Sequence, residues 1–377
     1  MNLKTPLLFV FTTCITLLQA QIKPVVIKAS SDKVSIRDGK IWKGATWTIV
    51  PEAKPDAYVT FNNQVTFITD VDSITVRVSP KNPSVDFVIL LNGKDSAWTQ
   101  VNYMEPYLTK LKKAAKYNYS DQRFIPSFTY QSMNAERLAK IRKDLKLDSI
   151  AGQGNEISKI INLMHWVHNT VRHDGSSDNP ALKNALDLIQ VCKTENRGVN
   201  CRMLATILNE CYLSMGIKSR HITCMPKETK FDDCHVINMV YSQDLKKWIW
   251  MDPTFDAYVM NEKGELLGVQ EVRERLINGK TLILNPDANW NRLSSQTRVE
   301  YLDQYMAKNL YRLQTPVASE YDTETQKEGK VFVYVELLPL DGLEQTPQKV
   351  ESTIIKTGEQ FVIYKTNNPE LFWAKPE

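Results

Sequence analysis

Residues 198–220 read GVNCRMLATILNECYLSMGIKSR and predict a helix with one apolar face. Asn200 is a favourable N-cap residue and Gly216 a favourable residue just beyond the last turn, so we expect the helix to span residues 201–215. The apolar side chains recur at helical spacing, at Leu204, Ile207, Leu208, Cys211, Tyr212 and Met215. Cys201 is therefore the first residue of the helix.

A thiol at the start of a helix is chemically activated. Cys201 lies at the positive end of the helix macrodipole, close to backbone N–H groups that have no partner inside the helix. Both features favour the thiolate, which is the nucleophilic form of cysteine. The same N–H groups can stabilise an oxyanion. We therefore predict that Cys201 is a nucleophile.

Two β-rich runs downstream supply a base and a carboxylate. The first run reads CHVINMVY from Cys234, and the second reads WIWMDPT from Trp248. If they pair as a hairpin with Tyr241 opposite Trp248, His235 and Asp252 share a face, with backbones roughly 7–8 Å apart. A cysteine, a histidine and an aspartate placed in this way are the nucleophile, base and orienting group of thiol acyl transfer.

These motifs resemble the core of the transglutaminase-like superfamily. In chain order they are Gly198-x-x-Cys201-x-x-x-Ala205, Gly216-Ile217-x-x-Arg220, His235 at the start of a strand, and Trp250-x-Asp252-Pro253-Thr254. The resemblance implies that Cys201 is the nucleophile, that His235 is the general base and acid, and that Asp252 orients His235. In the commoner form of the first motif one residue separates the glycine from the cysteine, whereas two residues do so here.

The chain before this core is predicted to contain a signal peptide and a β domain. Residues 1–20 combine Lys4, an apolar run and a small residue before Gln21, which is typical of a secretory signal peptide. Residues 21–104 contain many short alternating runs separated by turns, which indicate a small N-terminal β-sandwich.

The remainder, residues 105–377, is predicted to be a papain-like, transglutaminase-like catalytic domain, so that the whole protein is α+β. A helical connector is expected at 105–150, and C-terminal strands at 331–365 are expected to complete or abut the domain. The polar residues 320–330 are expected to form a mobile loop.

The tryptophans are expected in the core. Trp42, Trp47 and Trp98 are alternatively a sugar-stacking platform, but aromatic residues of a small sandwich usually pack inside it. Some relatives use an upstream tryptophan to bind the oxyanion, but the place of Trp166 in a predicted helix (157–171) favours core packing.

The other histidines are candidates for a metal site, and the other cysteines are candidates for a disulfide. His165, His168 and His173 lie close in sequence but lack a metalloprotease motif, so we expect solvated or hydrogen-bonded histidines. The five cysteines after the signal peptide include Cys224 and Cys234, whose pairing in a disulfide stays open.

The resemblance implies attack on a peptide or glutaminyl amide to give a thioester, which water or an amine then resolves. We expect hydrolysis by a cysteine peptidase, because transfer to an amine requires a site that excludes water. Protein-glutamine transamidation (cross-linking) is the alternative, and a catalytically inert scaffold that binds protein or glycan is the competing class.

Composition limits the partners. The net charge of +4 over 377 residues is too small to indicate nucleic-acid binding. The sequence also lacks a polybasic run, which would indicate binding to a membrane surface. The chemistry needs no cofactor or metal, and no acidic loop of the calcium-binding kind occurs in the sequence. We expect an exported protein, periplasmic or secreted, with a protein or peptide substrate and no membrane insertion after signal removal; the oligomeric state stays open.

Overall fold

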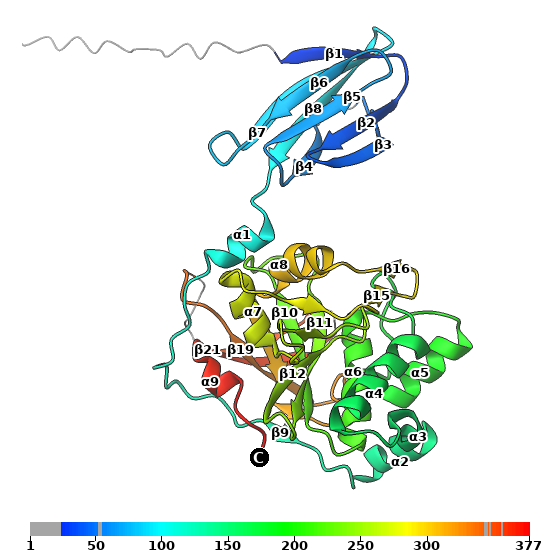
Figure 1. Ribbon diagram of the computed structural model, residues 1–377, viewed down its shortest axis with the longest axis vertical. Coiled ribbons are helices and arrows are strands. Elements are labelled where there is room, and N and C mark those ends of the chain that lie inside the picture. The colour runs from blue at the N-terminus through cyan, green and yellow to red at the C-terminus, as the bar shows by residue number, and fades with distance from the viewer. Residues whose placement is uncertain (1–23, 52–54, 343–345, 347, 356) are drawn as a thin grey trace, which may run out of the picture. The chain divides into compact units, whose positions relative to one another are not determined.

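A computed structural model describes residues 24–51, 55–342, 346, 348–355 and 357–377, and the predicted signal peptide lies outside them. The chain divides into two compact units, one ending at Glu105 and the other formed by Pro106–Glu377 (Figure 1). No helix in the described ranges is both long and apolar enough to cross a membrane.

The first unit contains two four-stranded sheets, ordered β1-β7-β8-β4 and β3-β2-β5-β6. Asn92 and Gly93 have φ of +52° and +68° and form the turn between β7 and β8, as their sequence predicts. One apolar cluster draws residues from both sheets, and within it the rings of Phe67 and Phe87 lie 5.1 Å apart. The strands are β1 (Val25–Ala29), β2 (Lys33–Asp38), β3 (Ile41–Thr48), β4 (Asp56–Thr60), β5 (Gln64–Ile68), β6 (Ser73–Arg77), β7 (Ser84–Leu91) and β8 (Asp95–Tyr103).

The core prediction for the three tryptophans of this unit is right only for Trp47, which packs against the apolar cluster. Trp42 and Trp98 are 53% and 41% exposed, so the prediction is wrong for them. The reason is strand alternation: Trp98 lies between the buried residues Ala97 and Thr99 and therefore points to the opposite face. Trp42 pairs with Arg37, whose guanidinium lies 5.6 Å from the ring centroid.

The second unit is built on a seven-stranded sheet of order β12-β11-β10-β17-β19-β21-β20. Tyr241 pairs with Trp248 in the β11–β12 hairpin, which confirms the predicted register. The C-terminal strands complete this sheet, as expected. Its strands are β10 (Ser219–Met225), β11 (His235–Ser242), β12 (Lys247–Met251), β17 (Arg312–Pro316), β19 (Val331–Leu337), β20 (Lys349–Thr353) and β21 (Gln360–Thr366).

Helices cover the sheet on both faces (Figure 1). Alternate residues of the hairpin enter two different apolar clusters: Met239 and Trp250 join one, and Val240 and Ile249 the other. The first cluster contains residues of α1 (Tyr107–Lys112), α7 (Val269–Ile277), the π-helix η1 (Val299–Met306), α8 (Ala307–Asn309) and α9 (Pro369–Phe372). The second contains residues of α2 (Glu136–Asp144), α3 (Leu147–Ala151), α4 (Glu156–Thr170), α5 (Ala185–Thr194) and α6 (Cys201–Ser214).

Helix α6 is the centre of the second cluster, and all its residues from Met203 to Ser214 are buried. Asn200 caps it, because its Oδ1 accepts a hydrogen bond from the Met203 N–H at 3.1 Å. Gly216 follows the helix with φ of +77°, and a Cβ there would lie 2.8 Å from the Met133 sulfur. The predicted helix and both of its end signals are thus confirmed to within one residue.

Short strands join the remaining segments. They are β9 (Thr129–Tyr130), which pairs with β18 (Ala318–Ser319); β13 (Val259–Met260), which pairs with β14 (Ile283–Leu284); and β15 (Asn289–Trp290), which pairs with β16 (Ser294–Ser295).

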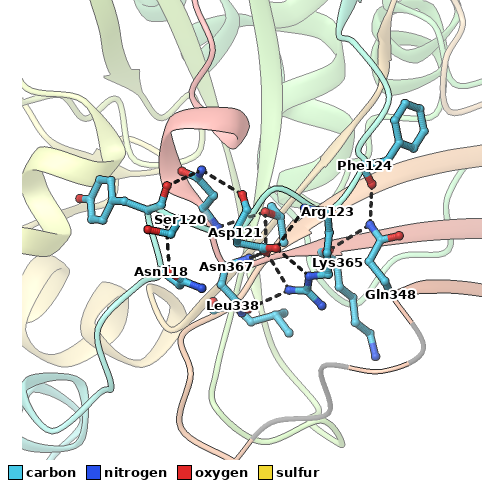
Figure 2. A network of polar contacts seen from close by, with 12 residues as sticks. Asn118, Ser120, Asp121, Arg123, Phe124, Leu338, Gln348, Lys365 and Asn367 are labelled. Atoms are coloured by element: carbon cyan, nitrogen blue, oxygen red, sulfur yellow. Dashed lines mark hydrogen bonds and ion pairs between the residues drawn. The ribbon is translucent and has the colours of Figure 1, made fainter.

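The predicted helical connector at 105–150 is helical only in α1, α2 and α3. The non-helical part crosses to the end of β21 and is fixed there by Asp121, as Figure 2 shows. Asp121 accepts hydrogen bonds from the Arg123 guanidinium at 2.8 Å and from the Asn367 N–H at 2.8 Å. Gln348 Nε2 in turn donates to the Phe124 carbonyl at 2.6 Å. This part of the connector is therefore fixed by contacts with distant segments of the chain.

The prediction that residues 320–330 are a mobile loop is wrong. Asp322, Glu324 and Thr325 are buried, and the Asp322 N–H donates to the buried Glu210 carboxylate of α6 at 2.8 Å. Glu324 lies 3.6 Å from the guanidinium of Arg202, the residue that follows Cys201. The buried polar groups of residues 320–330 are therefore paired with protein groups rather than with water.

We predict that Asp121→Asn lowers the free energy of unfolding by about 2 kcal/mol, because the Arg123 guanidinium and the Asn367 N–H lose their charged acceptor. The pKa of Asp121 is lowered, chiefly by the hydrogen bond from Arg123, so its contribution is present above the unfolded carboxyl pKa and is lost as pH falls below it. Chemical denaturation at pH 7 and pH 3 measures both effects. Asp144→Asn, at an exposed pair with Lys140, is the control and should cost less than about 0.5 kcal/mol. Equal losses for the two variants would contradict the prediction.

Candidate active site

Cys201 is the first residue of α6 and is partly exposed, while the rest of the helix after Arg202 is buried. The side chains of His173 and His235 and the Val236 N–H all lie close enough to its sulfur to lower the pKa of the thiol. The thiol therefore lies near three donors and is itself partly exposed.

His235 is the first residue of β11 and is 1% exposed. Its Nε2 lies 2.7 Å from Oδ2 of Asp252, the residue that directly follows β12. Because Nε2 of His235 is hydrogen-bonded to Asp252, Nδ1 is the ring nitrogen that remains for the contact with Cys201. The structure thus brings together all three residues that the sequence singled out.

Asp252 is fully buried and receives three further hydrogen bonds, the longest from the Phe255 N–H to its Oδ1 at 3.4 Å. The Tyr301 hydroxyl donates to its Oδ2 at 2.6 Å, and the Thr254 N–H donates to its Oδ1 at 2.9 Å. Trp250 Nε1 donates to the Tyr301 oxygen at 3.1 Å and fixes the direction of that hydroxyl. The carboxylate is therefore held from the β12 end and from the π-helix η1.

Aromatic rings enclose the imidazole of His235. The ring centroids of Tyr305 and Phe255 lie 5.3 Å and 5.5 Å from it, both at steep angles. These rings exclude water from the His235–Asp252 contact and so strengthen it.

The surroundings of Cys201 and His235 shift the pKa values of both side chains in the directions that favour an ion pair. Burial raises the pKa of the Cys201 thiol, but the hydrogen bonds from His173 and His235 outweigh it and lower the pKa to about 6. Burial lowers the pKa of His235, but the charge of Asp252 and the hydrogen bond to it raise that pKa to about 10. Near neutral pH the arrangement favours a thiolate beside an imidazolium.

His173 is the site residue that sequence reasoning did not assign. It lies between α4 and α5, and its only sequence signal was membership of a histidine group. The other two members have separate partners: His165 Nδ1 lies 2.5 Å from Asp256, and His168 Nδ1 lies 3.0 Å from the Pro253 carbonyl oxygen. Trp166 packs against the apolar cluster around α6, which confirms its expected core role.

Cys224 and Cys234 are both free thiols in the structure, so the disulfide that the sequence left open is not formed. Cys224 instead pairs across the sheet with His235.

The matched family is that of the transglutaminase-like superfamily, whose model fits residues 143–253. The match includes Cys201 and His235 and ends one residue after Asp252. The second unit therefore carries a transglutaminase-like core within a mixed helix and sheet fold.

Solved structures give weaker similarities. A proposed cysteine protease from Cytophaga hutchinsonii is 20% identical, with 42% of this chain and 51% of that chain covered and a TM-score of 0.26. Red sea bream transglutaminase is 12% identical, with 66% and 52% covered and a TM-score of 0.24. Rad4–Rad23 bound to a 6-4 photoproduct lesion is 13% identical, with 49% and 41% covered and a TM-score of 0.25. The chain spans about half of these structures' length or less, and a comparison with curated proteins gives no match.

We predict that alkylation of Cys201 by iodoacetamide accelerates as pH rises through about 6 and then stays constant up to about pH 10. The sign follows from the two pKa values: the thiolate forms above the lower one, and the imidazolium that stabilises it persists below the upper one. Peptide mass spectrometry of Cys201 over this pH range measures the rate. His235→Asn should move the midpoint up toward the ordinary thiol value. A wild-type midpoint near 9 would contradict the ion pair.

We predict that Tyr301→Phe slows acylation of Cys201 by about tenfold, because a buried carboxylate that loses a donor holds the His235 ring less firmly. The rate of thioester formation with an activated ester measures this. Tyr305→Phe is the matched control, since it removes a hydroxyl one turn further along the same segment. An effect of equal size in the control would assign the loss to packing rather than to Asp252.

Proposed function

We propose that the protein catalyses thiol-dependent acyl transfer on peptide or glutaminyl amides, and that the physiological reaction is peptide hydrolysis. The observation that carries the proposal is the contact of the Cys201 thiol with His235, whose other ring nitrogen lies 2.7 Å from Asp252. Cys201 is the proposed nucleophile, His235 the general base and acid, and Asp252 the residue that orients His235.

In the first half-reaction the Cys201 sulfur attacks the carbonyl carbon of the amide. A C–S bond forms, the carbonyl electron pair moves to oxygen, and the backbone N–H groups at the start of α6 face the charge that develops. When the C=O bond re-forms, the C–N bond breaks and the nitrogen takes the proton from His235 Nδ1. The products are a thioester on Cys201 and a free amine.

In the second half-reaction a water molecule attacks the thioester while neutral His235 accepts its proton. The C–S bond breaks, the carboxylic acid leaves, and the thiolate–imidazolium pair is restored. The hydrogen bond to Asp252 stabilises the imidazolium in both halves.

Hydrolysis and transamidation differ only in the acceptor of the acyl group. Of the three residues, only Cys201 is partly exposed, so the thioester would lie on the solvent side of the site. Water then competes with any amine that approaches, and this favours hydrolysis. Protein cross-linking is the second candidate.

In a catalytically inert scaffold, an imidazole and a carboxylate buried next to a thiol would bring no functional gain to offset their cost in stability. Burying such charges is costly unless they are paired, and an apolar replacement is often as stable. The arrangement is therefore better explained by chemistry than by stability.

The remaining proposals concern the parts around the core. We propose export through the predicted signal peptide at 1–20, with a protein or peptide as substrate. We also propose domain limits of 21–104 and 105–377, and a β-sandwich for the first domain, since Phe67 of one sheet packs against Phe87 of the other.

We predict that the protein, incubated with a glutamine-containing protein and a labelled primary amine, releases cleaved peptides and that Cys201→Ala abolishes the release. Mass spectrometry of the substrate measures cleavage and amine incorporation in one experiment. Amine at glutamine without cleavage would replace hydrolysis by transamidation. A Cys201→Ala variant as active as the wild type would refute the proposed nucleophile.

A further inference from the structure

The segment that carries His173 is bonded directly to the residues before Cys201. The Val199 N–H donates to the Arg172 carbonyl at 3.1 Å, and the Asp174 N–H donates to the Val199 carbonyl at 2.8 Å. His173 and Val199 therefore pair as a parallel β-bridge, two residues before the thiol. The position of the His173 ring relative to Cys201 is set by the backbone.

Gly198 makes this close approach possible. A Cβ at residue 198 would lie 2.6 Å from the Arg172 carbonyl oxygen and 2.7 Å from the Asp174 Cβ. Any larger residue would push the segment 172–174 away from the start of α6.

A hairpin far along the chain holds His173 from the other side. Asn291 Oδ1 accepts a hydrogen bond from the His173 N–H at 2.7 Å, and Asn291 Nδ2 donates to the His173 carbonyl at 2.9 Å. Trp290, the residue before it, donates from its indole Nε1 to His173 Nδ1 at 3.2 Å. Trp290 and Asn291 lie outside the segment 143–253 that matches the family model.

The indole contact determines which nitrogen of His173 carries a proton. An indole N–H only donates, so Nδ1 of His173 must accept and carries no hydrogen. The single ring proton of a neutral His173 is then on Nε2, the nitrogen left to donate to Cys201.

We infer that His173, held in its Nε2-protonated neutral form by Trp290, is a further catalytic residue that donates a hydrogen bond to the Cys201 sulfur and stabilises it as thiolate. The inference rests on the proposed function in that it assigns Cys201 as the nucleophile. It adds a division of roles between two histidines that contact one sulfur.

The partners of the two rings explain this division. His235 faces the Asp252 carboxylate, which stabilises a positive charge, whereas His173 faces a neutral indole hydrogen that a protonated Nδ1 would repel. His235 is thus the ring that carries and transfers the proton, and His173 is a fixed donor. The other titratable groups close enough to influence Cys201 include Arg202, Cys224, Cys234 and Tyr305.

The test is the pH dependence of Cys201 alkylation in the full chain, with iodoacetamide as the probe. His173→Leu should raise the midpoint by about one pH unit, which is a tenfold loss of thiolate below the midpoint. His173→Gln keeps a donor and should raise the midpoint by less. Trp290→Phe keeps the His173 ring but releases Nδ1, so it should shift the midpoint: upward if His173 loses its Nε2 proton, downward if His173 becomes an imidazolium. Nitrogen NMR of the wild type should show Nδ1 of His173 unprotonated.

The controls separate this role from packing. His165→Gln changes a histidine that faces Asp256, and Leu293→Ala changes a 79% exposed residue of the same hairpin, so both should keep the wild-type midpoint. If His173→Leu fails to fold by circular dichroism, Trp290→Phe decides the matter, because Trp290 is 37% exposed.

The outcomes distinguish the two proposals. A wild-type midpoint retained by both His173→Leu and Trp290→Phe, or by Trp290→Phe alone where His173→Leu does not fold, would overturn the role of His173 and leave the proposed function intact. A wild-type Cys201 that resists alkylation at pH 8 in the folded protein would instead overturn the proposed function. A midpoint that rises in His173→Leu, shifts in Trp290→Phe and stays constant in both controls would support the inference.

Discussion

The candidate site depends on a carboxylate that has no access to solvent. Asp252 is fully buried, and an unpaired carboxylate in that position would cost several kcal/mol, on the order of the whole stability of a domain. Tyr301, Thr254 and His235 each donate to it or pair with it, and they come from η1, the turn after β12 and the start of β11. The hydrogen bonds that the Asp252 carboxylate requires therefore fix the His235 ring. The position of this ring in turn fixes the proton that it shares with Cys201.

The parts of the site that are set by near neighbours in sequence could be predicted. The N-cap at Asn200 and the stop at Gly216 act within one helix, and they placed Cys201 at its first turn. The pairing of Tyr241 with Trp248 follows from strand composition and a short connection, and it placed His235 and Asp252 on one face. Local rules were sufficient because each of these constraints acts over a few residues.

The rest depends on contacts between distant segments, which periodicity does not encode. Tyr301 reaches Asp252 and Trp290 reaches His173 across 49 and 117 positions, and neither has a local signal. The same cause explains the errors in the fold. The sequence predicts a helical connector at 105–150 and a mobile loop at 320–330, yet Asp121 and Asp322 in these segments are buried and bonded to other elements. Composition reports that a residue is polar, not whether protein or water satisfies it.

A sulfur in contact with two imidazoles raises a problem of charge that the site resolves by the partners it gives each ring. Two imidazoliums beside one thiolate would repel each other, and two neutral rings would supply no proton to a leaving amine. One buried carboxylate serves His235 and one indole N–H serves His173, so a single mobile proton belongs to the pair Cys201–His235. This proton moves within a shielded contact, whereas the sulfur itself is partly exposed. In the proposed reaction, activation of the thiol would thus be separate from access to the thioester, and the acceptor would be selected by what reaches the exposed side of Cys201.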